Sequence, residues 1–497
     1  MIHTDFPGAR AACCALILSL AIAGTAHGQG TGTRRPLTLE AHTFRSFAGR
    51  EMQAELGRIT VPERRGATGG RTIEVAFVRL RTTAEHPDPP VVWLAGGPGV
   101  PGAAMARVPV YYALFERIRA RSDVILMDQR GIGMSRPLLD CPAPDAPLDL
   151  FASEARWSAV FRERTAACAR RYTSAGADLA GYTSEESADD VDDIRAALGY
   201  ERVSLLGHSY GTLLAQTYLI RHGGRVHRAV LAAVEGPHDR VSSPAVWDVL
   251  IGKLGYFAAR DTALGGAVPD LTALYRRVLE RLDRHPVVLT VTQRPSGRPV
   301  TLRVGGIGLR WVMRLKMNDA RSYAAIPALL LALDRGEYEP LARELEPLYN
   351  GFTRSAMANA VDCAGGWPRG RMADARVSSP GALFSNVNLQ WESGACAQAG
   401  VPRGHGGGRV FSTAPALFIS GTLDANTPPS QAEEVRWGFP ASVHLVIENA
   451  GHEALPSVAV QEVVARFLAG EDVSAAHLAF PAPRFTLRPP APAAAPR

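Results

Sequence analysis

The serine at position 209 lies in the pentapeptide GHSYG, residues 207–211, with a glycine two residues before it and another two residues after it. Residues 203–206 before it form a short apolar, β-prone run, and residues 213–220 carry apolar side chains at helical spacing. A tight turn from a strand into a helix has no room for a bulky Cβ at the two flanking positions, and glycine meets this need. The turn would expose the Ser209 hydroxyl at a strained corner, so the pattern predicts a nucleophile for acyl transfer.

A serine hydroxyl is a poor nucleophile until a base takes its proton and an acid orients that base. Asp424 follows the buried run at residues 414–421, and His452 follows the run at residues 443–447. We predict that His452 is the general base and then the general acid, and that Asp424 fixes its tautomer. Taken singly, a turn-capping aspartate and a surface-loop histidine would be the simpler interpretations. The order serine, aspartate, histidine, with each residue after a strand, favours catalysis.

An oxyanion also needs two preorganised backbone donors. We predict that one donor is the N–H of Tyr210, the residue after the nucleophile. The other is expected in the stretch GGPG, residues 96–99, which follows the apolar strand at residues 90–95, and we assign it to the N–H of Gly97. A plain glycine turn is the alternative interpretation of this stretch.

The elements that position these groups alternate between strands and helices, as in a parallel sheet with helices on both faces. An antiparallel hairpin or meander is predicted to open it, over residues 44–81. Further buried strands are predicted at residues 90–95, 122–127, 203–206, 227–233, 414–421 and 443–447. Because the carboxyl ends of parallel strands lie at one edge of a sheet, we expect Ser209, Asp424 and His452 to lie at that edge together.

An amphipathic helix is predicted over residues 187–198, with Ser187 as its N-cap. Its acidic residues could suggest a metal cluster, but we expect them to form a solvated face that also favours the helix dipole. They are Asp189, Asp190, Asp192 and Asp193. We expect Asp128 and Arg130 to brace the loops of the site through an ion pair. No metal site is predicted.

The alternation of strands and helices ends after residue 235 and begins again near residue 406. The intervening residues contain helical patterns and one hairpin, and we interpret them as a cap over the sheet, a separate domain being the alternative. The predicted division is a core over residues 29–235 and 406–475 with the cap at residues 236–405. A Pro/Ala-rich tail is assigned to residues 476–497, and residues 480–497 of it are expected to be disordered or loosely packed.

The composition is that of a globular protein: of 497 residues, 46% are hydrophobic and 21% are charged. The formal net charge is +6, but the arginines are scattered among acidic residues without a basic stripe, which argues against a nucleic-acid partner. Arg10, the apolar run at residues 11–23 and small residues at 26–28 predict a signal peptide over residues 1–28. A membrane anchor is the alternative, but the run of ~13 residues is short of the ~20 that a bilayer needs. We therefore expect a periplasmic or secreted protein without a stable membrane anchor. The sequence does not determine its oligomeric state.

Four cysteines follow the signal peptide, at positions 141, 168, 363 and 396. In an exported protein this number suggests two disulfides, for which the sequence allows three pairings. We favour Cys141 with Cys168 and Cys363 with Cys396, because each pair closes a loop within one region. A zinc site is the weaker alternative, since no C-x-x-C or paired histidine spacing accompanies the cysteines.

Five motifs resemble, in their order, those of the prolyl aminopeptidase family of α/β-hydrolase serine peptidases. They are GGPG (96–99), DQRGIGMS (128–135), GHSYGT (207–212), GTLDANTP (421–428) and GHEAL (451–455). The signal peptide, the long cap and the late cysteine pair are most similar to the secreted tripeptidyl aminopeptidase branch. One departure is Ala95, where many members carry histidine. The resemblance implies an α/β-hydrolase fold, with a mostly parallel central sheet, helices on both faces and a large, mainly helical cap.

The resemblance also implies a small substrate, either a short peptide or an aminoacyl amide or ester with a free N-terminus, and neither a metal nor an organic cofactor. Family members place acidic residues at the cap junction to hold the substrate ammonium, and Glu235 is the candidate here. A loop glutamate paired with an arginine is the equally weighted alternative. The expected function is an exported serine aminopeptidase of prolyl or tripeptidyl type. An esterase or amidase with the same triad is the alternative, and a non-catalytic binding protein of this fold is a remote one.

Overall fold

The computed structural model describes residues 35–141, 146–237, 242–264, 266–351, 354–386, 388, 394–401 and 408–487. They fall within one compact unit, Arg35–Arg497. The predicted signal peptide, residues 1–28, lies outside the described residues. Within the described part of the chain, we find no helix whose length and apolar character would let it cross a membrane.

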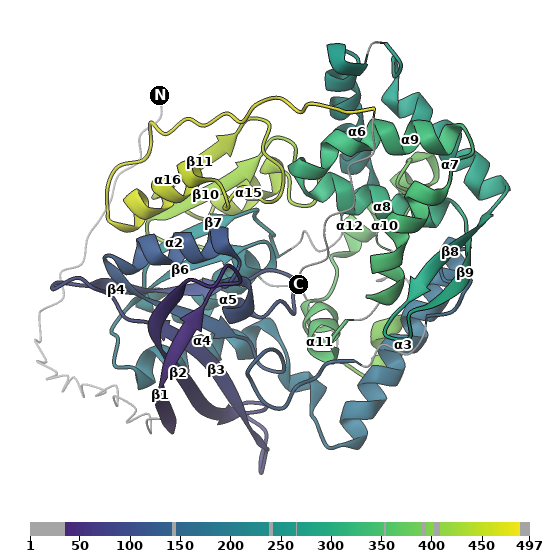
Figure 1. Cartoon of the computed structure of the whole chain (residues 1–497). Coiled ribbons are helices and arrows are strands. Elements are labelled where there is room, and N and C mark those ends of the chain that lie inside the picture. Colours follow the sequence, from purple (N-terminus) through teal and green to yellow (C-terminus); the bar gives the residue numbers. More distant parts are fainter. Residues whose placement is uncertain are drawn as a thin grey trace, which may run out of the picture. The chain divides into compact units, whose positions relative to one another are not determined.

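A nine-stranded sheet forms the centre of this unit, in the order β1-β2-β3-β5-β4-β6-β7-β10-β11 (Figure 1). The strands are β1 (Leu37–Arg45), β2 (Glu51–Pro62), β3 (Thr72–Leu80), β4 (Asp88–Leu94), β5 (Ser122–Asp128), β6 (Val203–His208), β7 (Val226–Ala232), β10 (Ala416–Gly421) and β11 (Ser442–Ile447). The first three strands pair antiparallel, and β3 also pairs antiparallel with β5. All pairs from β5 through β4, β6, β7 and β10 to β11 are parallel. The predicted mostly parallel sheet is confirmed.

Helices cover both faces of the sheet, which is why strands β5, β6 and β10 are buried along their whole length. On one face, α2 (Pro109–Arg119) and α16 (Val458–Leu468) share an apolar cluster with Trp93. On the other face lie α4 (Ser184–Ala197), α5 (Tyr210–His222) and α15 (Pro429–Arg436). The short helix α1 (Gly102–Met105) and helix α3 (Glu154–Ser174) complete this part of the chain.

Helix α4 begins earlier than predicted, at Ser184. Its N-cap is Thr183, whose hydroxyl accepts a hydrogen bond from the N–H of Glu186 at 3.2 Å. Ser187 is therefore a buried residue of the first turns, and the prediction that it caps the helix is wrong. Both residues are good N-caps by type, and the helix extends to the first of them because no residue between them breaks it.

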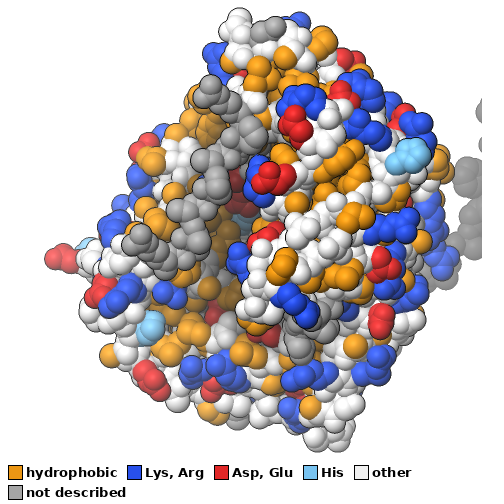
Figure 2. Space-filling model, turned by 45° about the vertical axis from the view of Figure 1, so that its right-hand side comes forward, with side chains coloured by type: hydrophobic (Ala, Val, Ile, Leu, Met, Phe, Trp, Pro, Cys, Tyr) orange, Lys and Arg blue, Asp and Glu red, His pale blue; other side chains and the backbone are white. Residues whose placement is uncertain are grey.

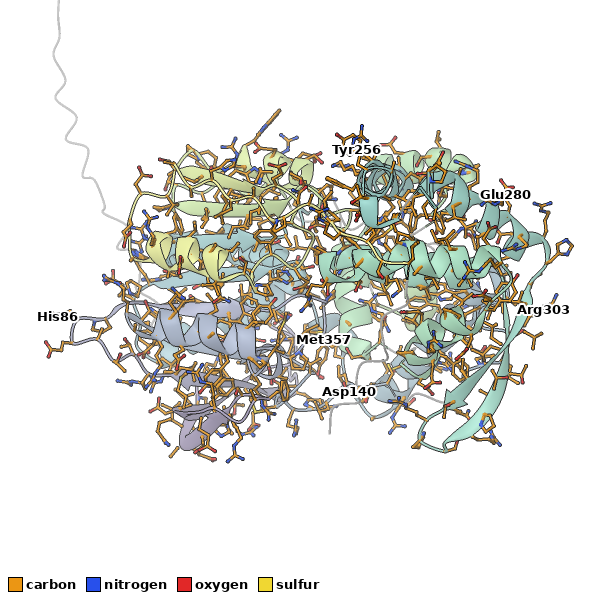
Figure 3. The ribbon with its side chains drawn as sticks, turned by 45° about the horizontal axis from the view of Figure 1, so that its top comes forward. His86, Asp140, Tyr256, Glu280, Arg303 and Met357 are labelled. Carbon is orange, nitrogen blue, oxygen red and sulfur yellow. A yellow bond between two sulfur atoms is a disulfide. The ribbon has the colours of Figure 1, made fainter. Side chains whose placement is uncertain are left out.

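Between β7 and β10 the chain forms mostly helices, with one hairpin. These elements are α6 (Pro244–Ala258), α7 (Leu271–Arg284), β8 (Val287–Gln293), β9 (Arg298–Val304), α8 (Gly306–Asn318), α9 (Ile326–Asp334), α10 (Glu339–Asn350), α11 (Ala356–Gly365), α12 (Arg369–Ser378) and α14 (Ala395–Ala399). The elements from α6 to α10 enclose an apolar cluster, which Trp157 of α3 joins by stacking on Trp311 at 5.0 Å. Within the insertion, α11 packs against the sheet: Met357, labelled in Figure 3, belongs to the same apolar cluster as β6 and α5. The face drawn in Figure 2 is hollowed, and apolar, acidic and basic side chains border the hollow.

The last described residues, 476–487, run from the sheet to the helical insertion. The N–H of Phe480 donates to the carbonyl of Glu448 at 2.8 Å, and the N–H of Phe485 donates to Asp261 at 2.8 Å. The Phe485 ring is buried in the apolar cluster of the insertion. The expectation of a disordered or loosely packed tail from residue 480 on is wrong for residues 480–487, because N–H groups of Phe480 and Phe485 find acceptors that composition alone does not reveal. Residues 488–497 lie outside the described residues.

Two disulfides are present, Cys141–Cys168 and Cys363–Cys396. The first ties the segment after β5 to α3, and the second ties α11 to α14. This is the local pairing that the sequence analysis favours, and it uses all four cysteines that the zinc alternative would have required.

Candidate active site

Ser209 lies between β6 and α5 with a φ of +55°, which is rare for a residue with a side chain. The two glycines around it are required by close backbone contacts. A Cβ on Gly207 would lie 2.6 Å from the carbonyl oxygen of Gly211, and a Cβ on Gly211 would lie 1.8 Å from that of Leu94. The strained turn predicted from the sequence is thus present, and strain of this kind gathers at functional sites.

The side chains of Asp424 and His452 come together with Ser209 at the carboxyl ends of β6, β10 and β11. Nε2 of His452 lies 3.1 Å from Oγ of Ser209, and Nδ1 of His452 lies 2.9 Å from Oδ2 of Asp424. All three residues are buried, and Ser209 retains 9% exposure. The structure therefore brings together the three residues predicted for catalysis, because parallel strands deliver their following loops to one edge.

The Asp424 carboxylate is held by the turn that follows it. The N–H groups of Asn426 and Thr427 donate to Oδ1 at 2.8 and 2.9 Å, and the Thr427 hydroxyl donates to Oδ2 at 2.6 Å. Burial by itself raises the pKa of Asp424, but His452 and the Thr427 hydrogen bonds outweigh it and lower the pKa below its usual value. Asp424 is therefore fixed in place, and its surroundings favour the charged form. Sequence reasoning missed Thr427, although it lies within the quoted motif.

His452 is tuned by three carboxylates. Burial lowers its pKa, but Asp424 and then Glu453 and Glu235 outweigh burial, so that the pKa lies above the usual value. With Nδ1–H directed at Asp424, the neutral ring presents its Nε2 lone pair to the Ser209 hydroxyl. This arrangement can accept the serine proton.

Glu235, predicted to bind substrate, follows β7 and is attached to the first turn of α5. Its N–H donates to Oγ1 of Thr212 at 2.9 Å, and its carbonyl accepts from Nε2 of Gln216 at 2.8 Å. The Thr212 hydroxyl also donates to the carbonyl of Ser209 at 2.7 Å. The backbone of Glu235 is therefore held beside the nucleophile, and the charge of its carboxylate raises the pKa of His452.

The two predicted oxyanion donors lie in two backbone segments next to Ser209. One is the start of α5, and the other is the glycine loop after β4. Tyr210 is the first residue of α5, and Gly97 has a φ of +117°, which glycine adopts without strain. The glycine loop packs on the nucleophile, because a Cβ on Gly96 would lie 3.1 Å from Cβ of Ser209. Helix α11 supports this loop from outside, since a Cβ on Gly99 would lie 3.0 Å from Cβ of Ala358.

Asp128 and Arg130 each brace a loop, but not through the expected ion pair. The carboxylate of Asp128 accepts backbone hydrogen bonds from Ala103 and Met134, both at 2.9 Å. Burial raises its pKa, while these hydrogen bonds lower it, and burial prevails. Arg130 instead binds the carboxylate of Asp190 at 2.6 and 2.7 Å and is fully buried. The expected pair is wrong because each group has a nearer, preformed partner.

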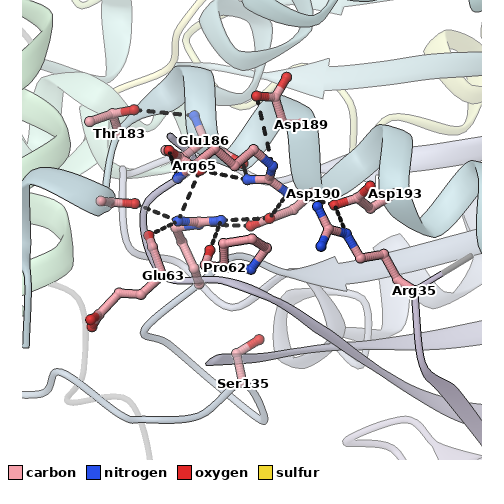
Figure 4. A network of polar contacts seen from close by, with 12 residues as sticks. Arg35, Pro62, Glu63, Arg65, Ser135, Thr183, Glu186, Asp189, Asp190 and Asp193 are labelled. Carbon is pink, nitrogen blue, oxygen red and sulfur yellow. Dashed lines mark hydrogen bonds and ion pairs between the residues drawn. The ribbon is translucent and has the colours of Figure 1, made fainter. Parts of the chain in front are cut away.

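The acidic residues of α4 form an ion-paired network and not a solvated face (Figure 4). Arg65 binds Glu186, Asp190 and Asp193, the last two at 2.8 and 2.7 Å. Asp189 pairs with Arg221 at 2.6 Å and with His222 at 2.8 Å, and these bonds lower its pKa although burial raises it. The expectation failed because the basic partners come from other elements, Arg65 from the loop after β2 and Arg221 and His222 from the end of α5, which spacing on the helix cannot reveal.

The helical insertion holds the loops that carry Asp424 and His452. The Tyr323 hydroxyl donates to the carbonyl of Leu423 at 2.8 Å, and the Lys253 ammonium donates to that of Thr422 at 2.8 Å. A Cβ on Gly451 would lie 3.0 Å from the Tyr323 hydroxyl oxygen. Tyr323 thus lies against both loops and fixes the separation of the acid and the base.

A second serine–histidine–carboxylate set occurs on β10, β11 and α15. Nε2 of His444 lies 3.0 Å from Oγ of Ser420, and Nδ1 of His444 contacts Glu433. Ser420, however, is a regular strand residue with 1% exposure. A substrate carbonyl cannot reach it, so this set provides an internal comparison for Ser209.

Comparison with known proteins places these observations in a family. The family model described as the alpha/beta hydrolase fold matches residues 89–457. Tripeptidyl aminopeptidase of Streptomyces coelicolor is 29% identical over 194 residues, which are 37% of this chain and 35% of that protein. Serine protease Hip1 of Mycobacterium tuberculosis is 29% identical over 190 residues, covering 37% and 36%. The chain thus spans little more than a third of the length of these relatives. The crystal structure of a proline iminopeptidase from Mycobacterium smegmatis covers 84% of this chain and 99% of its own, with 19% identity and a TM-score of 0.38.

Proposed function

The chain belongs to the alpha/beta hydrolase fold family, and we propose that it is an exported serine aminopeptidase that acts on peptides with free amino termini. The proposal rests on the hydrogen-bonded series in which Oγ of Ser209 lies 3.1 Å from Nε2 of His452, and Nδ1 lies 2.9 Å from Asp424. A serine, a base and an acid in this order are what acyl transfer through a covalent intermediate requires.

In the proposed mechanism, Nε2 of His452 takes the Ser209 proton as Oγ attacks the substrate carbonyl. The N–H groups of Gly97 and Tyr210 receive the negative charge that develops on the carbonyl oxygen. His452 then gives the proton to the leaving amine, and an acyl group remains on Ser209. Water activated by the same histidine releases the acyl group and restores the enzyme. Asp424 keeps its charge throughout and stabilises the imidazolium.

The preference for a free amino terminus is assigned to Glu235. Its charge already acts on His452, and it is anchored to the turn that carries Ser209. An ammonium group beside this carboxylate would hold the peptide with its first residues at the nucleophile. Relatives named tripeptidyl aminopeptidase and serine protease support a peptide substrate. The two disulfides support export, because such bonds persist in oxidising compartments.

The test is hydrolysis of matched anilides by the purified protein. The substrates are prolyl, alanyl and Ala-Ala-Pro anilides with free amino termini, their N-acetylated forms, and a short acyl ester. We expect cleavage of the free-amine forms, and Ser209→Ala should lower kcat by at least about a thousandfold. Ser420→Ala is the matched control and should retain activity, because its hydroxyl is buried away from substrate.

Two results would contradict the proposal. Equal cleavage of acetylated peptides, or cleavage of the ester alone, would indicate a general acyl hydrolase with the same triad. Full activity of Ser209→Ala would show that the nucleophile is another residue.

A further inference from the structure

Three side chains that could bind a metal ion meet beside the Ser209 hydroxyl: His208, His452 and Glu453. One donor atom of each lies within 4.8 Å of the other two, so some point lies within about 2.8 Å of all three. Zn²⁺ binds histidine nitrogen and carboxylate oxygen at about 2.0–2.2 Å. Side-chain shifts of less than about 1 Å would therefore bring all three donors to bonding distance.

The ring of His208 is buried and makes few polar contacts. It is 3% exposed, and Nε2 lies 3.4 Å from the carbonyl oxygen of His452, a long hydrogen bond that is its single one among the described residues. The same nitrogen lies 3.8 Å from Oε2 of Glu453. Nε2 of His208 is thus a buried donor atom that faces the other two ligands.

Glu453 offers a carboxylate oxygen that is not otherwise used. The Tyr111 hydroxyl donates to Oε2 at 3.0 Å, whereas Oε1 has no hydrogen-bond partner among the described residues. The side chain is 26% exposed, so an ion can reach it. Arg321 acts on it electrostatically but is bound to Asp319 at 2.8 Å.

His452 completes the set through Nε2, the atom that contacts Ser209. Its other nitrogen is bound to Asp424 at 2.9 Å, and a carboxylate behind a histidine is the usual outer partner of a zinc ligand. Tyr111 provides the corresponding support for Glu453. Two of the three ligands therefore already have the outer hydrogen bonds that orient metal ligands.

We propose that His208, His452 and Glu453 form a Zn²⁺ site, and that an ion bound there inhibits the enzyme. Nε2 of both histidines and one carboxylate oxygen of Glu453 bind the ion, and water occupies the remaining position. The ion takes the lone pair that would accept the Ser209 proton, so it displaces one hydrogen bond and breaks no covalent bond. The proposal of zinc binding does not depend on the proposed function, whereas the proposal of inhibition rests on it.

Binding is tested first, with zinc titrated into the full chain in competition with a chromophoric chelator. We expect His208→Gln and Glu453→Gln each to weaken zinc binding at least about tenfold, and Tyr111→Phe to weaken it about tenfold. Ser209→Ala should bind zinc at least as tightly as the wild type, because its hydroxyl no longer competes for the lone pair. His444→Gln, which alters the other histidine–carboxylate pair, should bind like the wild type. If His208→Gln does not fold, Glu453→Gln carries the test, because its side chain is only partly buried.

Inhibition is measured as the ratio of activity without and with zinc for each variant, so that changes in basal activity cancel. Wild-type activity should fall on addition of zinc and return with a chelator, and the ratio should move toward one in Glu453→Gln. Wild-type affinity in both His208→Gln and Glu453→Gln would overturn the site. Loss of the proposed hydrolytic function alone would leave the chelator titration unaffected, so the two failures are distinguishable.

Discussion

The hydroxyl oxygen of Thr427 lies 2.6 Å from Oδ2 of Asp424, the same carboxylate oxygen that contacts His452. It also lies 3.0 Å from Nδ1 of His452, so one hydroxyl touches both the acid and the base of the proposed triad. Thr427 is buried, and its N–H donates to the other oxygen of the same carboxylate. The turn after β10 thus fixes the direction in which Asp424 faces the imidazole.

Replacement of Thr427 by valine should lower kcat about 10- to 100-fold with a smaller change in KM. The valine keeps the shape of the side chain but removes the hydroxyl that orients Asp424. Thr427→Ser is the matched control and should recover most of the activity. Steady-state kinetics on a free-amine anilide measures both. Equal losses in the serine and valine variants would mean that the methyl group, and not the hydroxyl, is needed.

The acid side of the pH profile should depend on Glu235. His452 must be neutral to act as base, and its pKa is lowered by burial but held above the usual value by Asp424, Glu453 and Glu235. Glu235→Gln removes one of these charges, so the pKa falls and the acid limb of kcat/KM moves to lower pH. An ester substrate without an amino group keeps substrate binding out of the comparison.

The control for this shift is Glu433→Gln, which removes a carboxylate from the other histidine, His444. Its acid limb should coincide with that of the wild type. A Glu235→Gln limb that stays in place, or moves to higher pH, would show that Glu235 does not act on the base.

The buried pair of Arg130 and Asp190 should matter for stability more than the other ion pairs of α4. Asp190→Asn removes the carboxylate that accepts two hydrogen bonds from the fully buried Arg130 and leaves only the longer carboxylate contact with Glu186 at 3.4 Å, so we expect a loss of about 3–5 kcal/mol in the free energy of unfolding. Asp193→Asn, whose side chain is 24% exposed, should cost less than about 1 kcal/mol. Urea unfolding of the two variants measures the difference. Similar losses for both would mean that burial does not set the strength of this network.

The tail should contribute to the stability of the helical insertion. Phe485→Ala empties a buried site in the apolar cluster of the insertion and should cost about 3–5 kcal/mol. Leu487→Ala, two residues on and 44% exposed, should change stability by no more than about 0.5 kcal/mol. Thermal unfolding of both variants gives the comparison, and a neutral Phe485→Ala would indicate that the tail is dispensable.

Much of the fold and of the candidate site follows from the sequence. The glycines at positions 207 and 211 predict a tight turn around Ser209. A larger residue at either position would place its Cβ against backbone atoms. The apolar runs before Asp424 and His452 predict strands, and parallel strands bring their following residues to one edge. These are local constraints of sterics and periodicity, so they can be read without knowledge of distant residues. The local cysteine pairing belongs to the same class.

The ion pairs, the burial of the tail and the contact of His208 with Glu453 join residues that are far apart in the chain. Only the tertiary structure decided these features. Arg65 and Arg130 pair with acidic residues of α4 from separate loops, so a face that spacing predicts to be solvated is ion-paired. Phe485 is buried by an insertion whose helices begin more than two hundred residues earlier. His208 and Glu453 meet because β6 and the loop after β11 end at the same edge. Hydrogen bonds and ion pairs of this kind depend on angstrom-scale approach in space, and a sequence records only which partners are available.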